Sequence, residues 1–248
     1  GSEMCIRDRF EDFQNTHAFE LLKRWQDKIP CFNDDIQGTA SVSVTGLYSA
    51  MRVKGEKLSE QRVLFLGAGS AATGIAHLIA DAMAEEGLPR EEALKRIALV
   101  DSKGMVSSRR ADTLAANKLP FAHDLPLAGN LLDAVKVFKP TAIIGVSAQP
   151  KTFTKEVIEE MSALNERPII FALSNPTSKA ECTAAEAYQW SDGRAIFASG
   201  SPFAPVSFGG KTFVPRQGNN SYVFPGIGLG CVIAQPTMIP TGVFLTAA

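Results

Sequence analysis

The chain has little cysteine, no long apolar run and almost no net charge, and each absence excludes a class of protein. The four cysteines among 248 residues show no CxxC spacing, which argues against a zinc site or a disulfide framework. They are typical of reduced, buried thiols in an intracellular protein. A formal net charge of -1 lacks the basic excess that a nucleic-acid-binding surface needs. The most apolar stretch, residues 63–84, is interrupted by glycines and polar residues, which favours a strand and a helix over a membrane span.

The two ends of the chain predict little about the fold. The first residues contain no apolar core of the kind that a signal peptide has, and they begin with a Gly-Ser pair that resembles a cloning remnant. We therefore expect residues 1–9 to be non-native. Residues 242–248 are typical of the start of a helix, so we expect a truncated C-terminus. A cytoplasmic location is expected, with an organelle as the alternative.

From Arg62 onward, short apolar runs alternate with amphipathic segments. The apolar runs predict strands at residues 62–66, 97–101, 141–146, 168–173 and 195–198. The segments between them predict helices at residues 71–85, 89–96, 131–138, 155–164 and 184–190. Continuous apolar strands that alternate with helices indicate a doubly wound, Rossmann-type parallel sheet of the α/β class. We expect this domain to occupy residues 61–248.

Residues 10–60 are expected to form a helical segment ahead of the sheet. Apolar spacing predicts a helix over residues 10–29, which Pro30 would end. Residues 31–38 are expected to form a loop. Residues 39–53 are expected to form a second helix, rich in small residues that permit close packing.

A glycine-rich turn joins the first strand of the α/β region to its first helix. Its sequence GAGSAA fits GxGxxA in the strand-turn-helix context that dinucleotide binding requires. The first glycine permits the tight turn, the second admits the pyrophosphate, and the helix N-terminus attracts the phosphates. A turn kept only for packing is the alternative. The expected cofactor contacts on this turn are Gly67, Ala68, Gly69, Ser70, Ala71 and Ala72.

Polar residues follow the next two strands. Asp101 ends the second strand, where an acidic residue commonly bonds the adenosine ribose. Its distance from the turn exceeds the usual spacing of about 20 residues, which the extra segment at residues 88–96 explains. Ser102 and several cations could bind a 2′-phosphate, which favours NADP over NAD, with solvated surface charge as the alternative. These cations are Lys103, Arg109, Arg110 and Lys118. Ser147, after the third strand, is a further expected cofactor contact.

Two acidic pairs, Glu11-Asp12 and Asp34-Asp35, bracket a short helical stretch. Adjacent helical residues point about 100° apart, so Glu11 and Asp12 can face one point only near a helix end. Asp35 would then fold back from the following loop. Oxygen ligands suit Mg²⁺ or Mn²⁺, whereas the absence of histidine or cysteine pairs disfavours zinc. A hard cation beside a dinucleotide indicates a metal-assisted dehydrogenase, and solvated acidic pairs are the alternative.

Together these residues resemble the malic enzymes, the metal-dependent decarboxylating malate dehydrogenases. The resemblance extends over residues 10–231 and rests on six segments in one order. These segments are FEDF at 10–13, FNDDIQGT at 32–39, GAG at 67–69, ALSNPT at 172–177, ASGSPF at 198–203 and NNSYVFPG at 219–226. VDSKG at residues 100–104, with Lys118 beyond it, resembles the NADP-dependent branch.

The resemblance implies roles for particular residues. The metal ligands would be Glu11, Asp12 and Asp35, and Asp34 would be a catalytic carboxylate that tunes the base. Four asparagines would contact the cofactor or the substrate, since an amide can donate to a carboxylate without adding charge. Asn15 would contact the cofactor and Asn175 the cofactor or substrate; the substrate contacts would also include Asn219 and Asn220.

The implied reaction is oxidative decarboxylation of (S)-malate to pyruvate and CO₂ with NADP and Mg²⁺ or Mn²⁺, NAD being the alternative cofactor. The family's tyrosine acid and lysine base lie in an N-terminal portion without a counterpart before Phe10. The chain alone is therefore expected to show little or no turnover. We expect a small-molecule substrate, a homo-oligomer in the full-length form, and no nucleic-acid or membrane partner. Malolactic chemistry and a non-catalytic dinucleotide-binding module are the alternatives.

Overall fold

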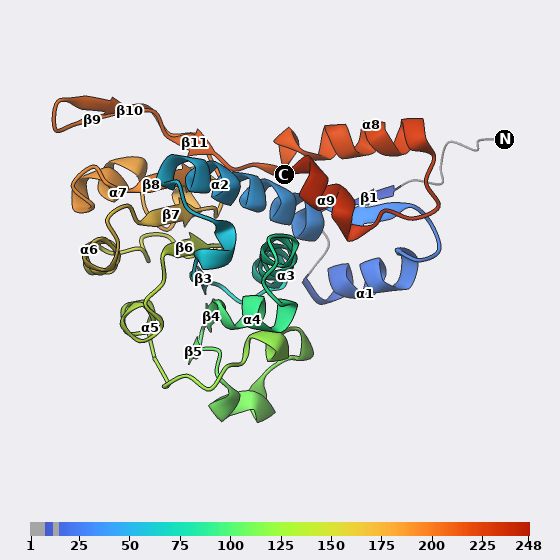
Figure 1. Ribbon diagram of the computed structural model, residues 1–248, viewed down its shortest axis with the longest axis horizontal. Coiled ribbons are helices and arrows are strands. Elements are labelled where there is room, and N and C mark those ends of the chain that lie inside the picture. Colours follow the sequence, from blue (N-terminus) through green and yellow to red (C-terminus); the bar gives the residue numbers. More distant parts are fainter. Residues whose placement is uncertain (1–7, 12–14) are drawn as a thin grey trace.

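The computed structural model describes residues 8–11 and 15–248 and is organised around a seven-stranded sheet (Figure 1). The strand order is β11-β8-β7-β6-β3-β4-β5, and neighbouring strands are parallel except β4 and β5, which are antiparallel. The strands are β3 (Val63–Leu66), β4 (Ile97–Asp101), β5 (Gly104–Met105), β6 (Ala142–Gly145), β7 (Ile169–Ala172), β8 (Ile196–Ser199) and β11 (Arg216–Gln217).

Helices cover both faces of the sheet, as Figure 1 shows. One face carries α2 (Thr39–Lys54), α3 (Ser70–Glu85), α4 (Arg90–Lys95) and α9 (Thr241–Ala247). The other face carries α5 (Leu131–Phe138), α6 (Lys155–Leu164) and α7 (Ala184–Trp190). The doubly wound α/β fold that the sequence predicts is therefore confirmed.

The central strand β3 shows why continuous apolar runs were needed. Successive side chains of a strand point to opposite faces, so both faces of a covered sheet require apolar residues. Val63 and Phe65 belong to the core on the α2 and α3 side, whereas Leu64 belongs to the core under α5 and α6. All three are fully buried. The sheet thus has two cores, one on each face.

Replacing Phe65 with alanine is expected to lower the free energy of unfolding by about 3–5 kcal/mol, because it leaves a cavity beneath α3. Urea denaturation followed by circular dichroism measures this loss. Val53→Ala is the control, since Val53 is an exposed residue of α2 and its truncation should change stability by no more than about 0.5 kcal/mol. Equal losses of stability in both variants would contradict the burial of Phe65 in the core on the α2 and α3 side.

The predicted strands and helices of the α/β part lie within one residue of the observed bounds. Upstream, two predictions are wrong. The helix expected over residues 10–29 is shorter, because α1 spans Asn15–Trp25 and Phe10 belongs to β1 (Asp8–Phe10). The loop expected over residues 31–38 is the strand β2 (Cys31–Asn33) followed by a π-helical turn, η2 (Asp34–Gly38).

The physical reason for both errors is pairing between distant segments. β1 and β2 form a parallel pair of three residues each, too short to show a period in the sequence. The side-chain oxygen of Asn33 then accepts a hydrogen bond from the Ile36 backbone N–H at 2.9 Å, which starts the η2 turn. β1 includes Asp8 and Arg9 from the segment expected to be non-native, whose origin stays a prediction.

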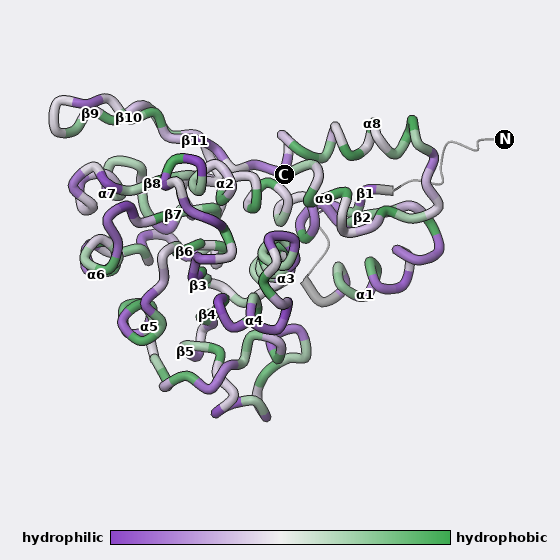
Figure 2. The backbone as a smooth tube through the Cα atoms, viewed as in Figure 1, coloured by the Kyte–Doolittle hydropathy of each residue, from purple (hydrophilic) through white to green (hydrophobic). Residues whose placement is uncertain are grey.

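The remaining elements lie at the edge of the fold. β9 (Val206–Phe208) and β10 (Lys211–Phe213) form an antiparallel hairpin that projects from the sheet (Figure 1). Figure 2 shows apolar residues along α8 (Phe224–Ala234). Several of its side chains are exposed, including Ile233. Within the described ranges, every helix is too short or too polar to cross a membrane.

All four cysteines were expected to be buried thiols, and the three that the structure describes are so. Cys31, Cys182 and Cys231 are free and buried, and burial raises the pKa of the Cys182 thiol. Cys5 lies outside the described residues. The described cysteines therefore act as small apolar core residues.

Candidate cofactor site and acidic cluster

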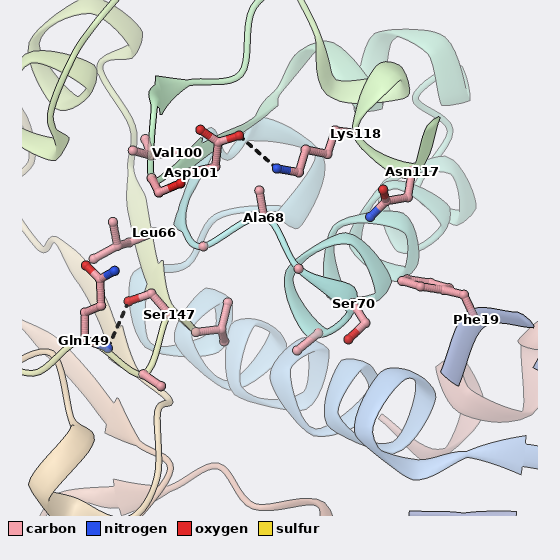
Figure 3. A pocket seen from close by; sticks show the side chains of 16 residues that line it. Phe19, Leu66, Ala68, Ser70, Val100, Asp101, Asn117, Lys118, Ser147 and Gln149 are labelled. Carbon is pink, nitrogen blue, oxygen red and sulfur yellow. Dashed lines mark hydrogen bonds and ion pairs between the residues drawn. The ribbon is translucent and has the colours of Figure 1, made fainter. Parts of the chain in front are cut away.

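The strand order creates a switch point between β3 and β6. The chain passes from β3 through α3 to β4 on one side and returns to β6 on the other. Ligands of open parallel sheets bind outside the carboxyl ends of the strands at such a point. A cavity of about 580 Å³ opens there (Figure 3). Its walls include most of the predicted cofactor residues, namely Gly67, Ala68, Gly69, Ser70, Ala71, Asp101, Ser102, Lys118 and Ser147.

The glycine turn forms the floor of this cavity. Gly67 has a φ of 120°, and a Cβ added there would lie 2.9 Å from the Val146 carbonyl oxygen. Ala72 does not line the cavity but is buried beneath it, which agrees with its expected packing role. α3 begins at Ser70 on the cavity wall, so its N-terminus favours an anion there.

An ion-pair network forms the wall after β4. Lys118 Nζ and Arg110 Nη2 donate to different oxygens of Asp101, each at 2.8 Å. Burial raises the pKa of Asp101, but hydrogen bonds from Lys118 and Arg110 outweigh it and hold the pKa below its usual range. Lys118 lines the cavity beside Ser102, whereas Arg110 also donates to the Met105 carbonyl and faces the chain behind it. Lys118 is thus the cation of this network that can contact a ligand in the cavity.

The opposite wall is the loop after β6. The Ser147 hydroxyl accepts a hydrogen bond from the Gln149 backbone N–H at 3.3 Å (Figure 3). Ala148 between them has a φ of 55°, in the left-handed region that non-glycine residues rarely adopt. Ser147 and Gln149 both line the cavity. A loop with a strained residue therefore faces the glycine turn across the cavity.

A second polar site, the acidic cluster, contains Glu11 and Asp34. Asp34 is fully buried, and its Oδ2 accepts a hydrogen bond from Asn220 Nδ2 at 2.8 Å. Arg9 lies 3.3 Å from both the Asp34 and the Glu11 carboxylates. Burial, and then the negative charge of Glu11, raise the pKa of Asp34 to about 7, while Arg9 opposes the rise. Two carboxyls in contact leave an excess of acceptor oxygens in this cluster.

The acidic cluster lies beside the cofactor cavity. The η2 turn that carries Asp34 packs on α3 at Gly74, where an added Cβ would lie 2.6 Å from Ile36 Cγ2. That contact is about one helical turn from Ser70 on the cavity wall. Phe19 of α1 lines the cavity as well (Figure 3). The structure therefore brings α1 and η2 against the same end of α3.

The acidic cluster suits a hard cation in its chemistry. Asp34 Oδ1 is buried without a hydrogen-bond partner, and carboxylate oxygens are the ligands that Mg²⁺ and Mn²⁺ prefer. Asp35 is half-buried in the same turn, and its charge contributes to the raised pKa of Asp34. Asp12 lies outside the described residues. Within residues 8–11 and 15–248, no three His, Cys, Asp or Glu side chains are grouped as a metal site, so the ligand set stays a prediction.

The predicted asparagines are not gathered at one site. Asn220 contacts Asp34, and Asn219 accepts a hydrogen bond from the Ser221 backbone N–H at 3.0 Å. Asn175 is exposed on the loop after β7 and lies outside the cavity lining. Asn15 begins α1. Their roles toward substrate and cofactor stay predictions.

Several cavity residues were missed by the sequence analysis. Asn117 precedes the predicted contact Lys118, and Gln149 lies two residues after the predicted contact Ser147, so their positions could have suggested them. Phe19 gave no such sign, because its place in the wall depends on how α1 packs against α3. Glu181, a buried carboxylate behind the β6 loop, was also missed.

Comparison with known proteins decides the family. Residues 36–248 match the family described as malic enzyme, NAD binding domain. The chain belongs to the malic enzymes. The chain is 55% identical over 249 aligned positions to the NADP-dependent malic enzyme of Vitis vinifera, which covers 100% of this chain and 42% of that relative. The human NADP-dependent malic enzyme is 55% identical over 241 positions, covering 97% of this chain and 42% of the relative.

Solved structures of malic enzymes have a fold similar to that of this chain. The Entamoeba histolytica malic enzyme superposes with a TM-score of 0.79 at 28% identity, covering 97% of this chain and 46% of that one. This chain thus spans less than half the length of these relatives. What it shares with them is the dinucleotide-binding fold together with the segment that leads into it.

Proposed function

We propose that this chain binds NADP as the cofactor-binding portion of a malic enzyme that converts (S)-malate to pyruvate and CO₂. The observation that carries the proposal is the cavity at the β3–β6 switch point, bounded by the Gly67 turn and the Asp101–Lys118 pair. A turn kept only for packing would not require a cation held at the cavity wall by a half-buried carboxylate. Membership in the malic enzymes supplies the reaction.

We infer a strand end for each part of the dinucleotide. The pyrophosphate lies on the N-terminus of α3, where helix N–H groups and the dipole favour anions. The adenosine ribose lies by Asp101 and Ser102 at the end of β4, and the 2′-phosphate by Lys118. Since β6 and β7 lie on the other side of β3, the nicotinamide half extends toward Ser147.

The acidic cluster is where the divalent cation would be held, with Glu11, Asp12 and Asp35 as its ligands. When bound, Mg²⁺ or Mn²⁺ supplies electrophilic activation of the hydroxy acid and stabilises the negative charge that develops on loss of CO₂. Asp34 orders the cluster, because it accepts from Asn220 and pairs with Arg9. Gly38 leaves room for it, since a side chain there would overlap Asp34 Oδ1.

Calorimetric titration of the chain with NADP⁺, in the presence and absence of Mn²⁺, tests this proposal. We expect one NADP⁺ per chain, weaker binding of NAD⁺, and a separate Mn²⁺ site. Incubation of this chain with malate, NADP⁺ and Mn²⁺ should yield little or no NADPH absorbance, because the chain spans less than half the length of its malic enzyme relatives. NADPH production at ordinary malic enzyme rates would contradict the expected lack of turnover. Absence of NADP⁺ binding would overturn the proposal.

Two alternatives predict different outcomes. A non-catalytic dinucleotide-binding module would bind NADP⁺ with no Mn²⁺ site. Malolactic chemistry would return the hydride to the product, so the full-length protein would consume malate without releasing NADPH. A homo-oligomer and an intracellular location stay predictions, the first of which sedimentation of the full-length protein tests.

A further inference from the structure

Behind the β6 loop lies a fully buried carboxylate, Glu181, which precedes α7 and does not line the cavity. Burial raises the pKa of Glu181, although hydrogen bonds oppose the rise. A buried carboxyl is costly unless its oxygens are bonded, so its partners indicate what it stabilises. Its carboxyl accepts hydrogen bonds from residues of the loops after β6 and β7.

The carboxyl joins those two loops. Glu181 Oε1 accepts from the Ser147 backbone N–H at 3.3 Å and from the Ser174 hydroxyl, and Oε2 accepts from the Ser174 backbone N–H at 3.4 Å. The Ser174 hydroxyl in turn accepts from the Ala148 backbone N–H at 2.9 Å. A continuous chain of bonds thus connects Glu181 to the cavity wall.

The surrounding backbone is shaped to admit this carboxyl. At Gly145, the last residue of β6, an added Cβ would lie 2.3 Å from Glu181 Cδ, a separation that no real side chain tolerates. Ala148 holds its left-handed φ of 55° while its N–H is bonded to Ser174. A strained conformation persists only where its surroundings fix it, and Glu181 with Ser174 supplies that constraint.

We propose that Glu181 is a positioning residue that fixes the loops after β6 and β7 for the nicotinamide half of the dinucleotide. The inference rests on the proposed function, because the strand order assigns these loops to the half that lies away from Asp101 and Lys118. Glu181 touches no part of the ligand itself. It acts through Ser147, Ala148 and Ser174, which lie at the ends of β6 and β7.

The test compares two probes on the same chain by calorimetry: NADP⁺ and adenosine 2′,5′-bisphosphate, which lacks the nicotinamide half. Glu181→Ala removes the acceptors of two backbone N–H groups, so NADP⁺ affinity should fall about tenfold or more. Affinity for adenosine 2′,5′-bisphosphate should change less than about twofold. Glu181→Gln keeps one acceptor oxygen and should give a smaller loss of NADP⁺ affinity alone.

Two further variants separate positioning from general stability. Glu186→Ala removes the capping carboxylate of α7, five residues from Glu181, and should lower the melting temperature while leaving both affinities unchanged. Ser174→Ala removes the hydrogen bond from the Ala148 backbone N–H. The double variant Ser174→Ala, Glu181→Ala should lose no more NADP⁺ affinity than Glu181→Ala alone. The reason is that the two residues act in one chain of hydrogen bonds.

Equal losses for both probes in Glu181→Gln would overturn the inference, because the carboxyl would then support the whole cavity. Unchanged NADP⁺ affinity in Glu181→Ala would overturn it as well. Failure of the unaltered chain to bind adenosine 2′,5′-bisphosphate is a different result. It would overturn the proposed function, and the inference with it.

Discussion

Replacing Gly67 with alanine is expected to reduce NADP⁺ affinity by about 100-fold or more, which corresponds to about 2.7 kcal/mol. Two effects combine at this position. The φ of 120° is one that L side chains rarely adopt, at a cost of about 1–3 kcal/mol. A Cβ would also lie 2.9 Å from the Val146 carbonyl oxygen, which pushes the turn away from β6 and toward the pyrophosphate position. Calorimetric titration with NADP⁺ measures the loss.

Gly87→Ala is the matched control for this variant. Gly87 has a φ of 96° but no atom within 4 Å of an added Cβ, so its substitution introduces backbone strain without a clash. We expect a modest loss of stability and unchanged NADP⁺ affinity. If Gly67→Ala bound NADP⁺ as well as Gly87→Ala does, the turn would not be the floor of the cofactor site.

The features predicted well from sequence are those that neighbouring residues determine. β3 is a run of apolar residues because a covered parallel strand needs them on both faces, and Gly67 follows where the chain must turn sharply. The strand, turn and helix therefore appear together in the sequence, and with them one wall of the cavity. Asp101 was predictable for the same reason, since it ends the neighbouring strand.

The features that were missed depend on contacts between distant segments. β1 and β2 are short strands that exist because they pair with each other, and η2 depends on packing against Gly74 of α3. Glu181 stands in a polar stretch with no motif around it. Its importance follows only from Gly145 and the two loops that converge on it in three dimensions. No local pattern could have shown these relations.

Replacing Lys118 with glutamine is expected to lower NADP⁺ affinity by about 10- to 100-fold and to leave NAD⁺ affinity unchanged. Lys118 Nζ is held at the cavity wall by Asp101, 2.8 Å away, and its remaining ammonium protons can donate to a 2′-phosphate. Glutamine keeps most of the length of the side chain but removes the charge. Calorimetry with both nucleotides at fixed ionic strength measures the difference, because salt screens such contacts.

The NAD⁺ measurement decides between two roles for Lys118. If the lysine served only to neutralise Asp101, its loss would disturb the carboxylate next to the adenosine ribose, and both nucleotides have that ribose. A loss confined to NADP⁺ therefore identifies the 2′-phosphate as the partner, whereas equal losses would assign Lys118 to Asp101 alone. Lys103→Gln is the control, since the Lys103 side chain does not line the cavity and only its backbone N–H bonds Asp101, at 2.9 Å. Unchanged affinities in Lys118→Gln would remove the 2′-phosphate assignment and, with it, the preference for NADP.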